Sequence, residues 1–266
     1  MKYVVVTGAS GGMGLAVVKR LMQDGYHVFA LDKNVESLSS LQGNITPLQV
    51  DLTDSDSVVR AFELVKGITQ SLYAILHFAG VYVLDSLIET AEQKIEKAFD
   101  VNFFGAFRVN KAFFPLLEQG SRIVIATSEL APLAPLPFTG IYAITKSTLD
   151  KYAYSLRMEV QLKGVHVSVL RPGAVKTDML GVSMDQLQQF CDNTQIYQCN
   201  ATRFKKVVES VEAKNIAPQK VAKKVSKILF AKHPRYVYKI NRNPLLLMLN
   251  ALPQRWQTAI IKKILK

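Results

Sequence analysis

The sequence predicts an α/β fold in which a doubly wound parallel sheet carries helices on both faces. Short runs rich in Val, Ile and aromatic residues recur along the chain: KYVVV, HVFAL, YAILHF, RIVIA and VHVSVL. Segments with the apolar spacing of helices separate these runs, which is the pattern of βαβ units. The runs show little alternation of polar and apolar residues, as expected for parallel strands that are covered on both faces.

The composition is that of one folded domain without a disulfide framework or a zinc site. The chain has 266 residues, of which 49% are hydrophobic and 20% are charged, and this length can bury one sizeable core. The two cysteines, Cys191 and Cys199, lack CxxC spacing, so we expect no metal and a reducing compartment. The apolar run before Thr7 is too short for a secretory signal, so we expect a cytoplasmic protein.

A glycine cluster, TGASGGMG, follows the first predicted strand and opens the first predicted helix. Gly8, Gly12 and Gly14 allow a tight turn, a close approach of the backbone to a pyrophosphate and close packing of the helix on the strand. The N–H groups at the start of the helix would face the anion. We therefore expect a dinucleotide phosphate to bind here, with Ser10 and Met13 of the same turn as further contacts.

Two acidic residues follow later strands and fit the adenosine end of such a cofactor. Asp32 lies 18 residues after Gly14, near the spacing at which a carboxylate binds the ribose hydroxyls. Because this carboxylate would repel a 2′-phosphate, we expect NAD rather than NADP, although the neighbouring Lys33 keeps NADP open. Asp51 would hold the adenine amino group or, alternatively, cap the next helix.

A tyrosine and a lysine lie one helical turn apart in the segment YAITK. The spacing from Tyr142 to Lys146 puts both side chains on one helix face. A nearby cation favours the phenolate, so we expect the pKa of Tyr142 to fall from about 10 toward neutrality, as a general acid or base requires. Ser128 follows the fifth predicted strand, at the end where open α/β sheets bind ligands.

These motifs together resemble the short-chain dehydrogenase/reductase family over residues 1 to 180. The matching residues are Thr7, Gly8, Gly12 and Gly14 of TGxxxGxG, then Asn102, Ser128, Tyr142 and Lys146, and finally Pro172, Gly173, Val175 and Thr177 of PGxVxT. The resemblance implies a Rossmann-like fold and hydride transfer between a nicotinamide cofactor and an alcohol or carbonyl substrate.

The resemblance also implies a role for each matching side chain. Tyr142 would exchange the hydroxyl proton, and Ser128 would hold the substrate oxygen. Lys146 would bind the nicotinamide ribose and lower the pKa of the tyrosine, and Asn102 would anchor a water molecule of a proton relay. The remaining implied cofactor contacts are Leu52, Phe78, Ala79, Gly80, Pro172 and Gly173, with Val175 and Thr177 at the carboxamide.

The segment HFAG after the fourth predicted strand departs from the NNAG of many family members. It is similar to the sugar-nucleotide epimerase branch, whose TGxxGxxG motif also fits through Gly8, Gly11 and Gly14. The chain is too short for the extra substrate domain of that branch, so the single-domain dehydrogenase is the preferred interpretation. His77 is interpreted as a packing or hydrogen-bonding residue rather than a catalyst.

Residues 213 to 266 form a strongly basic tail with ten Lys, three Arg and no acidic residue. Such a charge favours an anionic partner, and we prefer a membrane surface because no nucleic-acid-binding motif accompanies it. Residues 254 to 266 predict an amphipathic helix whose apolar face Gln257 interrupts. This helix either docks on the protein body or lies in a membrane surface.

We divide the single domain into a nucleotide-binding catalytic core, residues 1 to 180, and a substrate lid with the basic extension, residues 181 to 266. Pro244 and Pro253 interrupt the apolar run of the extension, so we expect no transmembrane helix.

The apolar loop PLAPLPF, residues 132 to 138, and a weaker resemblance to retinol and hydroxysteroid dehydrogenases indicate a hydrophobic alcohol or carbonyl substrate. A homo-oligomer, dimer or tetramer, is expected. The rival from another class is a non-catalytic, membrane-associated nucleotide-binding protein.

Overall fold

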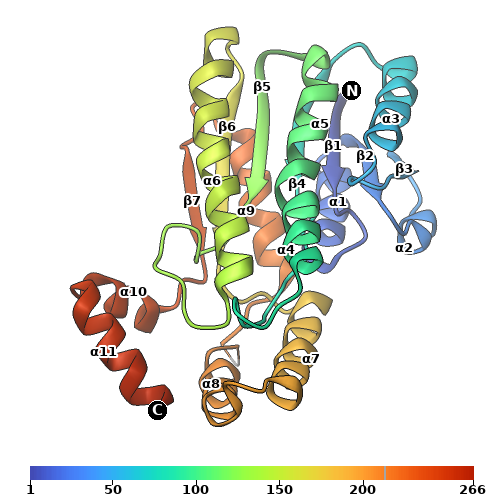
Figure 1. The fold of residues 1–266 in the computed structure, drawn as a ribbon. Helices are drawn as coiled ribbons and strands as arrows, with labels where there is room; N and C mark the ends of the chain where they lie inside the picture. Colours follow the sequence, from blue (N-terminus) through green and yellow to red (C-terminus); the bar gives the residue numbers. More distant parts are fainter. Residues whose placement is uncertain (213) are drawn as a thin grey trace.

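The computed structural model describes residues 1–212 and 214–266. Its described part is built on seven parallel strands in the order β3-β2-β1-β4-β5-β6-β7, with helices on both faces (Figure 1). The predicted doubly wound, Rossmann-like fold is therefore confirmed.

The strands are β1 (Lys2–Thr7), β2 (Tyr26–Asp32), β3 (Ile45–Gln49), β4 (Leu72–His77), β5 (Leu117–Ala126), β6 (His166–Pro172) and β7 (Val237–Ile240). The helices are α1 (Gly12–Gln23), α2 (Glu36–Ser39), α3 (Ser55–Ile68), α4 (Glu92–Phe99), α5 (Gly105–Phe113), α6 (Gly140–Val160), α7 (Asp178–Asn193), α8 (Gln198–Glu212), α9 (Pro218–Phe230), α10 (Pro244–Ala251) and α11 (Gln254–Leu265). A π-helical turn, η1 (Asp100–Phe104), joins α4 to α5, and the 3-10 turns η2 (Phe114–Leu116) and η3 (Gln161–Lys163) precede β5 and β6.

Both faces of the sheet are apolar, because alternate residues of each central strand point to opposite sides. Val4 and Val6 of β1 pack with α1 and α9 on one face. Val5 packs with α3 and α5 on the other face, and α6 covers β5 and β6 on that same side. This burial on two sides explains why the strands lack polar alternation in the sequence.

The sheet layer also takes elements from beyond residue 180. β7 pairs with β6 in parallel, and α9 buries Val221, Val225 and Leu229 in the cluster that contains α1. The sequence pattern predicted neither element, because a strand of four residues gives a short signal and the lysines of α9 were read as part of the basic tail. Lys223 and Lys227 lie exposed on α9, so the basic residues of the tail are divided between two parts of the molecule.

In the described part of the chain, four helices lie outside the layers that cover the sheet. α7 and α8 lie beyond the carboxyl ends of the strands, and α10 and α11 form a separate pair near them (Figure 1). Pro244 is the first residue of α10, and Pro253 directly precedes α11. No helix in residues 1–212 or 214–266 is both long enough and apolar enough to cross a membrane.

A largely buried ion pair joins α6 to the end of β6, next to the strand ends that carry the site. The Asp150 carboxylate accepts hydrogen bonds from Nε and Nη2 of Arg171 at 2.9 and 2.6 Å. Thr127 Oγ1 donates to the same carboxylate at 3.2 Å, and the Tyr236 hydroxyl donates to the Asp150 carbonyl at 3.0 Å. This arrangement fixes α6 against β5, β6 and the segment that leads into β7.

Replacing Asp150 with alanine should lower the free energy of unfolding by about 3–5 kcal/mol, because the Arg171 guanidinium would stay buried without its partner. Urea unfolding followed by circular dichroism measures this loss. Arg60→Ala is the matched control, since the pair of Arg60 with Asp54 is largely exposed and should contribute about 1 kcal/mol or less. Equal losses in the two variants would contradict the prediction.

Candidate active site

Close backbone contact shapes the turn between β1 and α1. Gly8 has a φ of 64°, and a Cβ atom there would lie 2.4 Å from Ala79 N. A Cβ atom on Gly14 would lie 1.9 Å from Gly8 O, and one on Gly12 would lie 2.7 Å from a methyl carbon of Thr177. Side chains are therefore excluded here. The first turn of α1 presents backbone N–H groups to a cleft, which fits an anion such as a pyrophosphate.

The cleft has a volume of about 1510 Å³ and lies where the strand order reverses between β1 and β4. The candidate residues that line it are Gly8, Ser10, Gly12, Met13, Gly14, Asp32, Asp51, Leu52, Phe78, Ala79, Gly80 and Thr177. The structure thus brings the glycine turn, both acidic residues and the segment after β4 around one cleft. The candidate residues outside its lining are Asn102, Ser128, Tyr142, Lys146, Pro172, Gly173 and Val175.

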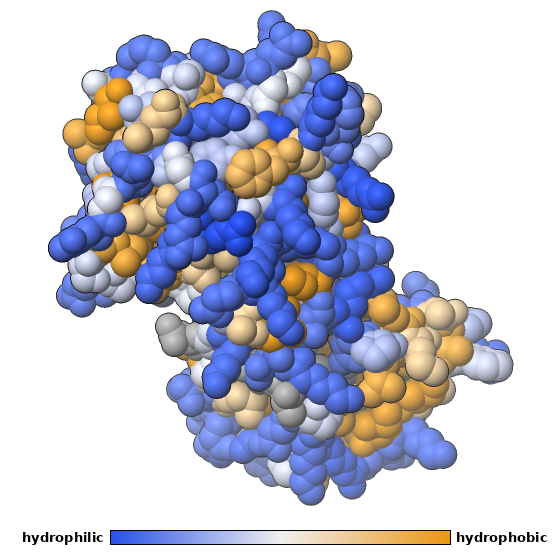
Figure 2. Space-filling model, turned by 180° about the vertical axis from the view of Figure 1, so that it is seen from behind, coloured by the Kyte–Doolittle hydropathy of each residue, from blue (hydrophilic) through white to orange (hydrophobic). Residues whose placement is uncertain are grey.

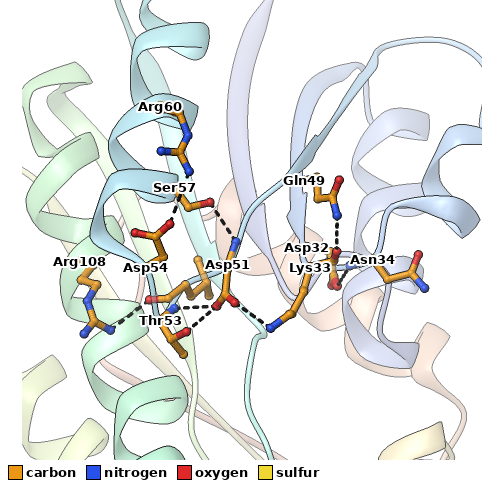
Figure 3. Close-up of polar contacts among 11 residues, drawn as sticks. Asp32, Lys33, Asn34, Gln49, Asp51, Thr53, Asp54, Ser57, Arg60 and Arg108 are labelled. Carbon is orange, nitrogen blue, oxygen red and sulfur yellow. Dashed lines mark hydrogen bonds and ion pairs between the residues drawn. The ribbon is translucent and has the colours of Figure 1, made fainter.

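Hydrogen bonds hold the Asp32 carboxylate at the end of β2, against the glycine turn. Its Oδ2 accepts from Ser10 N at 3.0 Å, and its Oδ1 accepts from Asn34 N at 3.1 Å. The neighbouring Lys33 extends away to form an ion pair with Asp51, with 2.7 Å between Nζ and Oδ2 (Figure 3). Asp32, which would favour NAD, and Lys33, which would tolerate NADP, therefore bind different partners.

Asp51 is the centre of a second set of contacts in Figure 3. Its Oδ1 accepts from the backbone N and the Oγ1 of Thr53 at 3.0 and 2.7 Å. The hydrogen bonds from Lys33 and Thr53 lower the pKa of Asp51 to about 2. The alternative reading of Asp51 as the cap of the next helix is wrong, because Asp54 caps α3 and accepts from Asp56 N.

Arg108 is a cleft residue that sequence reasoning missed. Its Nη1 donates to the Leu52 carbonyl at 3.1 Å and lies 2.7 Å from Asp100 Oδ1. It therefore ties the loop after β3 to the start of η1. No motif marks this residue in the sequence, because the contact depends on how α5 packs beside that loop.

Asn102 is buried in the π-helical turn η1. Its Oδ1 accepts from Val81 N at 2.7 Å, and its Nδ2 donates to the Val81 carbonyl at 3.0 Å and to Thr145 Oγ1 at 2.9 Å. The side chain thus joins the segment after β4 to α6, one residue before Lys146. π-helical turns within helices are frequent at functional sites.

The Lys146 side chain is buried, and its amine lies behind the cleft wall. Nζ donates to the Ala126 carbonyl at 3.3 Å, and a Cβ atom on Gly80 would lie 3.1 Å from Nζ. Burial lowers the pKa of Lys146 to about 8, because the charged form loses its hydration. The absence of a side chain at Gly80 leaves the amine next to the cleft.

Tyr142 lies on the same helix face, with the Lys146 amine 5.8 Å from the centre of its ring. Burial raises the pKa of Tyr142 to about 12, and its hydrogen bond with Ser128 offsets part of that rise. The expectation that Lys146 brings this pKa toward neutrality is wrong for this structure. The loss of hydration of the phenolate outweighs the attraction of a cation at this distance.

Tyr82 connects Tyr142 to the cleft, and sequence reasoning missed it. Its ring centre lies 4.7 Å from that of Tyr142, and Tyr82 itself lines the cleft. Gln186 of α7 fixes the backbone here, since its Nε2 donates to the Tyr82 carbonyl and its Oε1 accepts from Leu84 N. These partners lie 104 and 102 residues apart in the chain, so no local pattern could reveal them.

The segment after β6 is held by backbone contacts. The Pro172 carbonyl accepts from Glu129 N, and a Cβ atom on Gly173 would lie 1.9 Å from Asn241 O. Val175 forms a parallel bridge with Ile216, and the segment then leads to Thr177, directly before α7. This path brings Thr177 against Gly12 in the lining of the cleft.

His77 is buried at the end of β4. Its Nε2 is hydrogen-bonded to Asn110 Oδ1 at 2.8 Å. Burial lowers the pKa of His77 to about 4, so the ring is neutral at pH 7. These contacts are those of a packing and hydrogen-bonding residue, as the sequence interpretation expects.

Comparisons with known proteins agree with this geometry. A sequence model of the short chain dehydrogenase family matches residues 2–188. The uncharacterized oxidoreductase YbbO of Escherichia coli strain K12 is 30% identical over 247 residues, which cover 90% of this chain and 85% of that protein. The NADPH-dependent 1-acyldihydroxyacetone phosphate reductase of Schizosaccharomyces pombe is 32% identical over 179 residues, which cover 66% of this chain and 60% of that protein.

A solved structure extends the likeness to the fold of nearly the whole chain. The alcohol dehydrogenase of Thermococcus sibiricus, complexed with 5-hydroxy-NADP, is similar with a TM-score of 0.73 and 21% identity. The match covers 92% of this chain and 99% of the archaeal chain. None of these matches favours the epimerase interpretation. The chain belongs to the short-chain dehydrogenase/reductase family of oxidoreductases.

Proposed function

We propose that the protein transfers a hydride between NAD and a hydrophobic alcohol or its carbonyl product. The substrate is a secondary alcohol and ketone or a primary alcohol and aldehyde. The observation that carries the proposal is the grouping of Ser128, Tyr142 and the Lys146 amine behind Gly80, at the edge of a cleft built around a glycine turn. A phenol, a hydroxyl and an amine at this place can supply the proton and hold the substrate oxygen during hydride transfer to a carbonyl.

In this proposal the nicotinamide supplies or accepts the hydride, and the protein handles the proton. Tyr142 gives its proton to the substrate oxygen during reduction and removes it during oxidation, while Ser128 holds that oxygen by a hydrogen bond. Lys146 binds the nicotinamide ribose, and its positive charge offsets part of the cost of forming the phenolate. Asn102 positions the Val81 backbone and anchors the water molecule of a proton relay.

NAD is the proposed cofactor because the Asp32 carboxylate lies where the adenosine ribose would bind. Two backbone N–H groups hold Asp32 there, and the ion pair with Asp51 draws Lys33 away from it. The carboxylate can accept hydrogen bonds from both ribose hydroxyls and would repel a 2′-phosphate. NADP remains the alternative, and the fission-yeast relative is NADPH-dependent by its name.

The surroundings of Tyr142 support a hydrophobic substrate. Tyr82, Leu136 and Phe138 belong to an apolar cluster beside it, and the fission-yeast relative is named for an acyl-bearing substrate. We propose residues 181 to 266 as the lid and extension of this site, although α9 and β7 within that range pack on the sheet.

A homo-oligomer is part of the proposal. Exposed apolar side chains on η1, α5 and α6, namely Phe104, Phe107, Ile144 and Met158, support a second subunit at that face.

We also propose a cytoplasmic protein with peripheral membrane contact through the basic helix at residues 254 to 266, and no nucleic-acid partner.

Tyr142→Phe should lower the rate of hydride transfer at least a hundredfold, because it removes the proton that the reaction exchanges. The affinity for NAD should stay within about threefold of the wild type, a change below 1 kcal/mol, since the cofactor contacts are unchanged. A screen of hydrophobic alcohols with NAD, read by the absorbance of the reduced nicotinamide, measures the rate. NAD binding without turnover of any alcohol by the wild type would favour the non-catalytic alternative. Near wild-type turnover by the variant would refute the acid/base assignment.

Asp32→Ser should weaken NAD binding and relieve the repulsion of a 2′-phosphate. The preference for NAD over NADP should therefore shift by at least about tenfold, which corresponds to about 1.4 kcal/mol. Titration of both cofactors by isothermal calorimetry measures the shift. Glu36→Gln, an exposed acid on α2, is the control and should leave the ratio unchanged. A wild-type protein that prefers NADP would overturn the assignment of Asp32.

Lys146→Met should stabilise the protein at pH 7 by about 3 kcal/mol, because the wild type bears the cost of a buried cation. The pKa of Lys146 is about 8 in the folded protein and about 10.4 in the unfolded chain, so the penalty is complete below pH 8 and disappears above pH 10.4. The two proteins should therefore converge in unfolding free energy as the pH rises from 7 to 10.5. Urea unfolding at each pH tests this, and a constant difference would contradict it.

A further inference from the structure

Helix α11 presents two stripes of side chains, one turned toward the protein and one exposed. Gln257 and Leu265 are buried and Ile261 is half-buried, and these three residues form the inner stripe. Trp256, Ile260 and Ile264 are exposed by 61%, 38% and 52% and form the outer stripe. Both stripes repeat every four residues along the helix. The two alternatives that the sequence left open, a docked helix and a surface-binding helix, therefore apply to different faces of one helix.

The inner stripe attaches α11 to α7 and α8, which are the helices of the proposed lid. Leu265 packs in the cluster that contains Phe190 of α7 and Phe204 of α8, and its carbonyl accepts a hydrogen bond from Asn200 Nδ2 at 2.6 Å. Gln257 Nε2 donates to the Leu252 carbonyl at 2.8 Å, at the end of α10. Gln257 therefore does not weaken the helix face, as its polarity in the sequence indicated, but joins α11 to α10.

Helix α10 is fastened in turn to the loop between Ser128 and Tyr142. The Asn250 side chain accepts a hydrogen bond from Ala134 N at 2.7 Å, and Glu129 accepts one from Asn243 N at the start of α10, also at 2.7 Å. The hairpin of α10 and α11 thus contacts the loop beside the reacting groups at one end and the lid at the other.

An apolar seam runs between these two attachments. Phe138, at the end of the loop, has a φ of 65°, a conformation that costs a residue with a side chain and persists here because its ring is held. Its ring centre lies 4.6 Å from that of Phe190 and 5.4 Å from that of Phe204. The same cluster includes Tyr82, which packs on Tyr142, and Leu265 of α11. Apolar side chains therefore continue from Tyr142 to the hairpin.

The outer surface of the hairpin combines apolar and basic residues. Leu245 and Met248 of α10 are exposed by 64% and 67%, and Figure 2 shows apolar side chains gathered over this projecting part of the molecule. Residues 241 to 266 contain Arg242, Arg255, Lys262, Lys263 and Lys266 and no acidic residue. A helix with Trp and Ile on one side and Lys and Arg on the other has the composition of helices that lie in the surface of an anionic membrane.

We infer that the outer surface of the α10–α11 hairpin binds an anionic lipid bilayer and that a substrate dissolved in that bilayer reaches Tyr142 along the apolar seam. The inference rests on the proposed function, and it specifies the substrate as a lipid-soluble alcohol or carbonyl compound. The positive charge of the hairpin favours an anionic surface, and the packed apolar side chains of the seam link the hairpin to Tyr142.

Trp256 is the only tryptophan of the chain, so its fluorescence reports docking without a label. Vesicles of phosphatidylserine and phosphatidylcholine should shift its emission to shorter wavelength, and high salt should weaken the effect by screening. Lys262→Gln together with Lys263→Gln should reduce the vesicle affinity by about tenfold. An unchanged emission spectrum with anionic vesicles at low salt would overturn the inference.

Ile260→Ser together with Ile264→Ser should also reduce vesicle binding by about tenfold, since both side chains would lose their burial in lipid. Ile68→Ser together with Leu162→Ser is the matched control, because these apolar residues are exposed on α3 and η3 and should not affect binding. Sedimentation equilibrium tests the alternative that a second copy of this chain, rather than lipid, covers the outer stripe. If the Ile260 and Ile264 variant loses a subunit contact, a second copy covers the stripe and the inference is wrong.

The route is tested with one substrate in two presentations, cetyl alcohol in anionic vesicles and in detergent micelles, with NAD in both. The variant with serine at 260 and 264 should be about tenfold slower than the wild type on vesicles and equal to it on micelles. Equal rates on vesicles would overturn the route. Failure of the wild type to oxidise the alcohol in either presentation would count against the proposed function and against a lipid-soluble alcohol as substrate, while the Trp256 emission would still decide docking.

Discussion

The site depends on a contact between two stretches of backbone that leaves no space for a side chain. The turn after β1 and the segment after β4 meet where a Cβ atom on Gly8 would lie 2.4 Å from Ala79 N. This approach presents the start of α1 to the cleft, brings Ser10 N to Asp32, and places Gly80 beside Lys146. A larger residue at Gly8 would separate β1 from the loop after β4, so fold and site share one constraint.

Burial shifts the pKa values of the two titratable groups proposed for the reaction, and in both cases it favours the neutral form. Lys146 is a buried amine and Tyr142 a half-buried phenol, and their loss of hydration moves their pKa values to about 8 and about 12. A phenol in this environment stays protonated unless a nearby positive charge stabilises the phenolate. A neighbouring oxygen atom that accepts a hydrogen bond from the buried amine would raise the pKa of that amine. The family resemblance gave both residues their roles, but the direction that it implied for the tyrosine pKa, downward, is the opposite of the direction in the structure. That direction follows from burial, which depends on the packing of α6 on the sheet.

Much of this architecture is encoded locally and was therefore predictable. Apolar runs such as YAILHF mark strands that are buried on both faces. The spacing of Gly8, Gly12 and Gly14 marks the turn between β1 and α1. The contacts of Tyr82 and Arg108 were not predictable, because each joins elements distant in the sequence. β7 was missed because a strand of four residues gives a short signal, and α9 was missed because its lysines were assigned to the basic tail although its apolar residues have helical spacing.

The central claim is that this site moves a hydride to and from a carbonyl carbon. The most direct measurement is isotope transfer from NADH deuterated at nicotinamide C4 to a hydrophobic ketone, followed by mass spectrometry and NMR of the alcohol product. The account predicts deuterium on the carbinol carbon, and only when one particular face of the nicotinamide carries the label, because Thr177 and Val175 are proposed to fix the carboxamide. Deuterium found only in solvent, or no alcohol formed from any ketone while NADH remains bound, would contradict it.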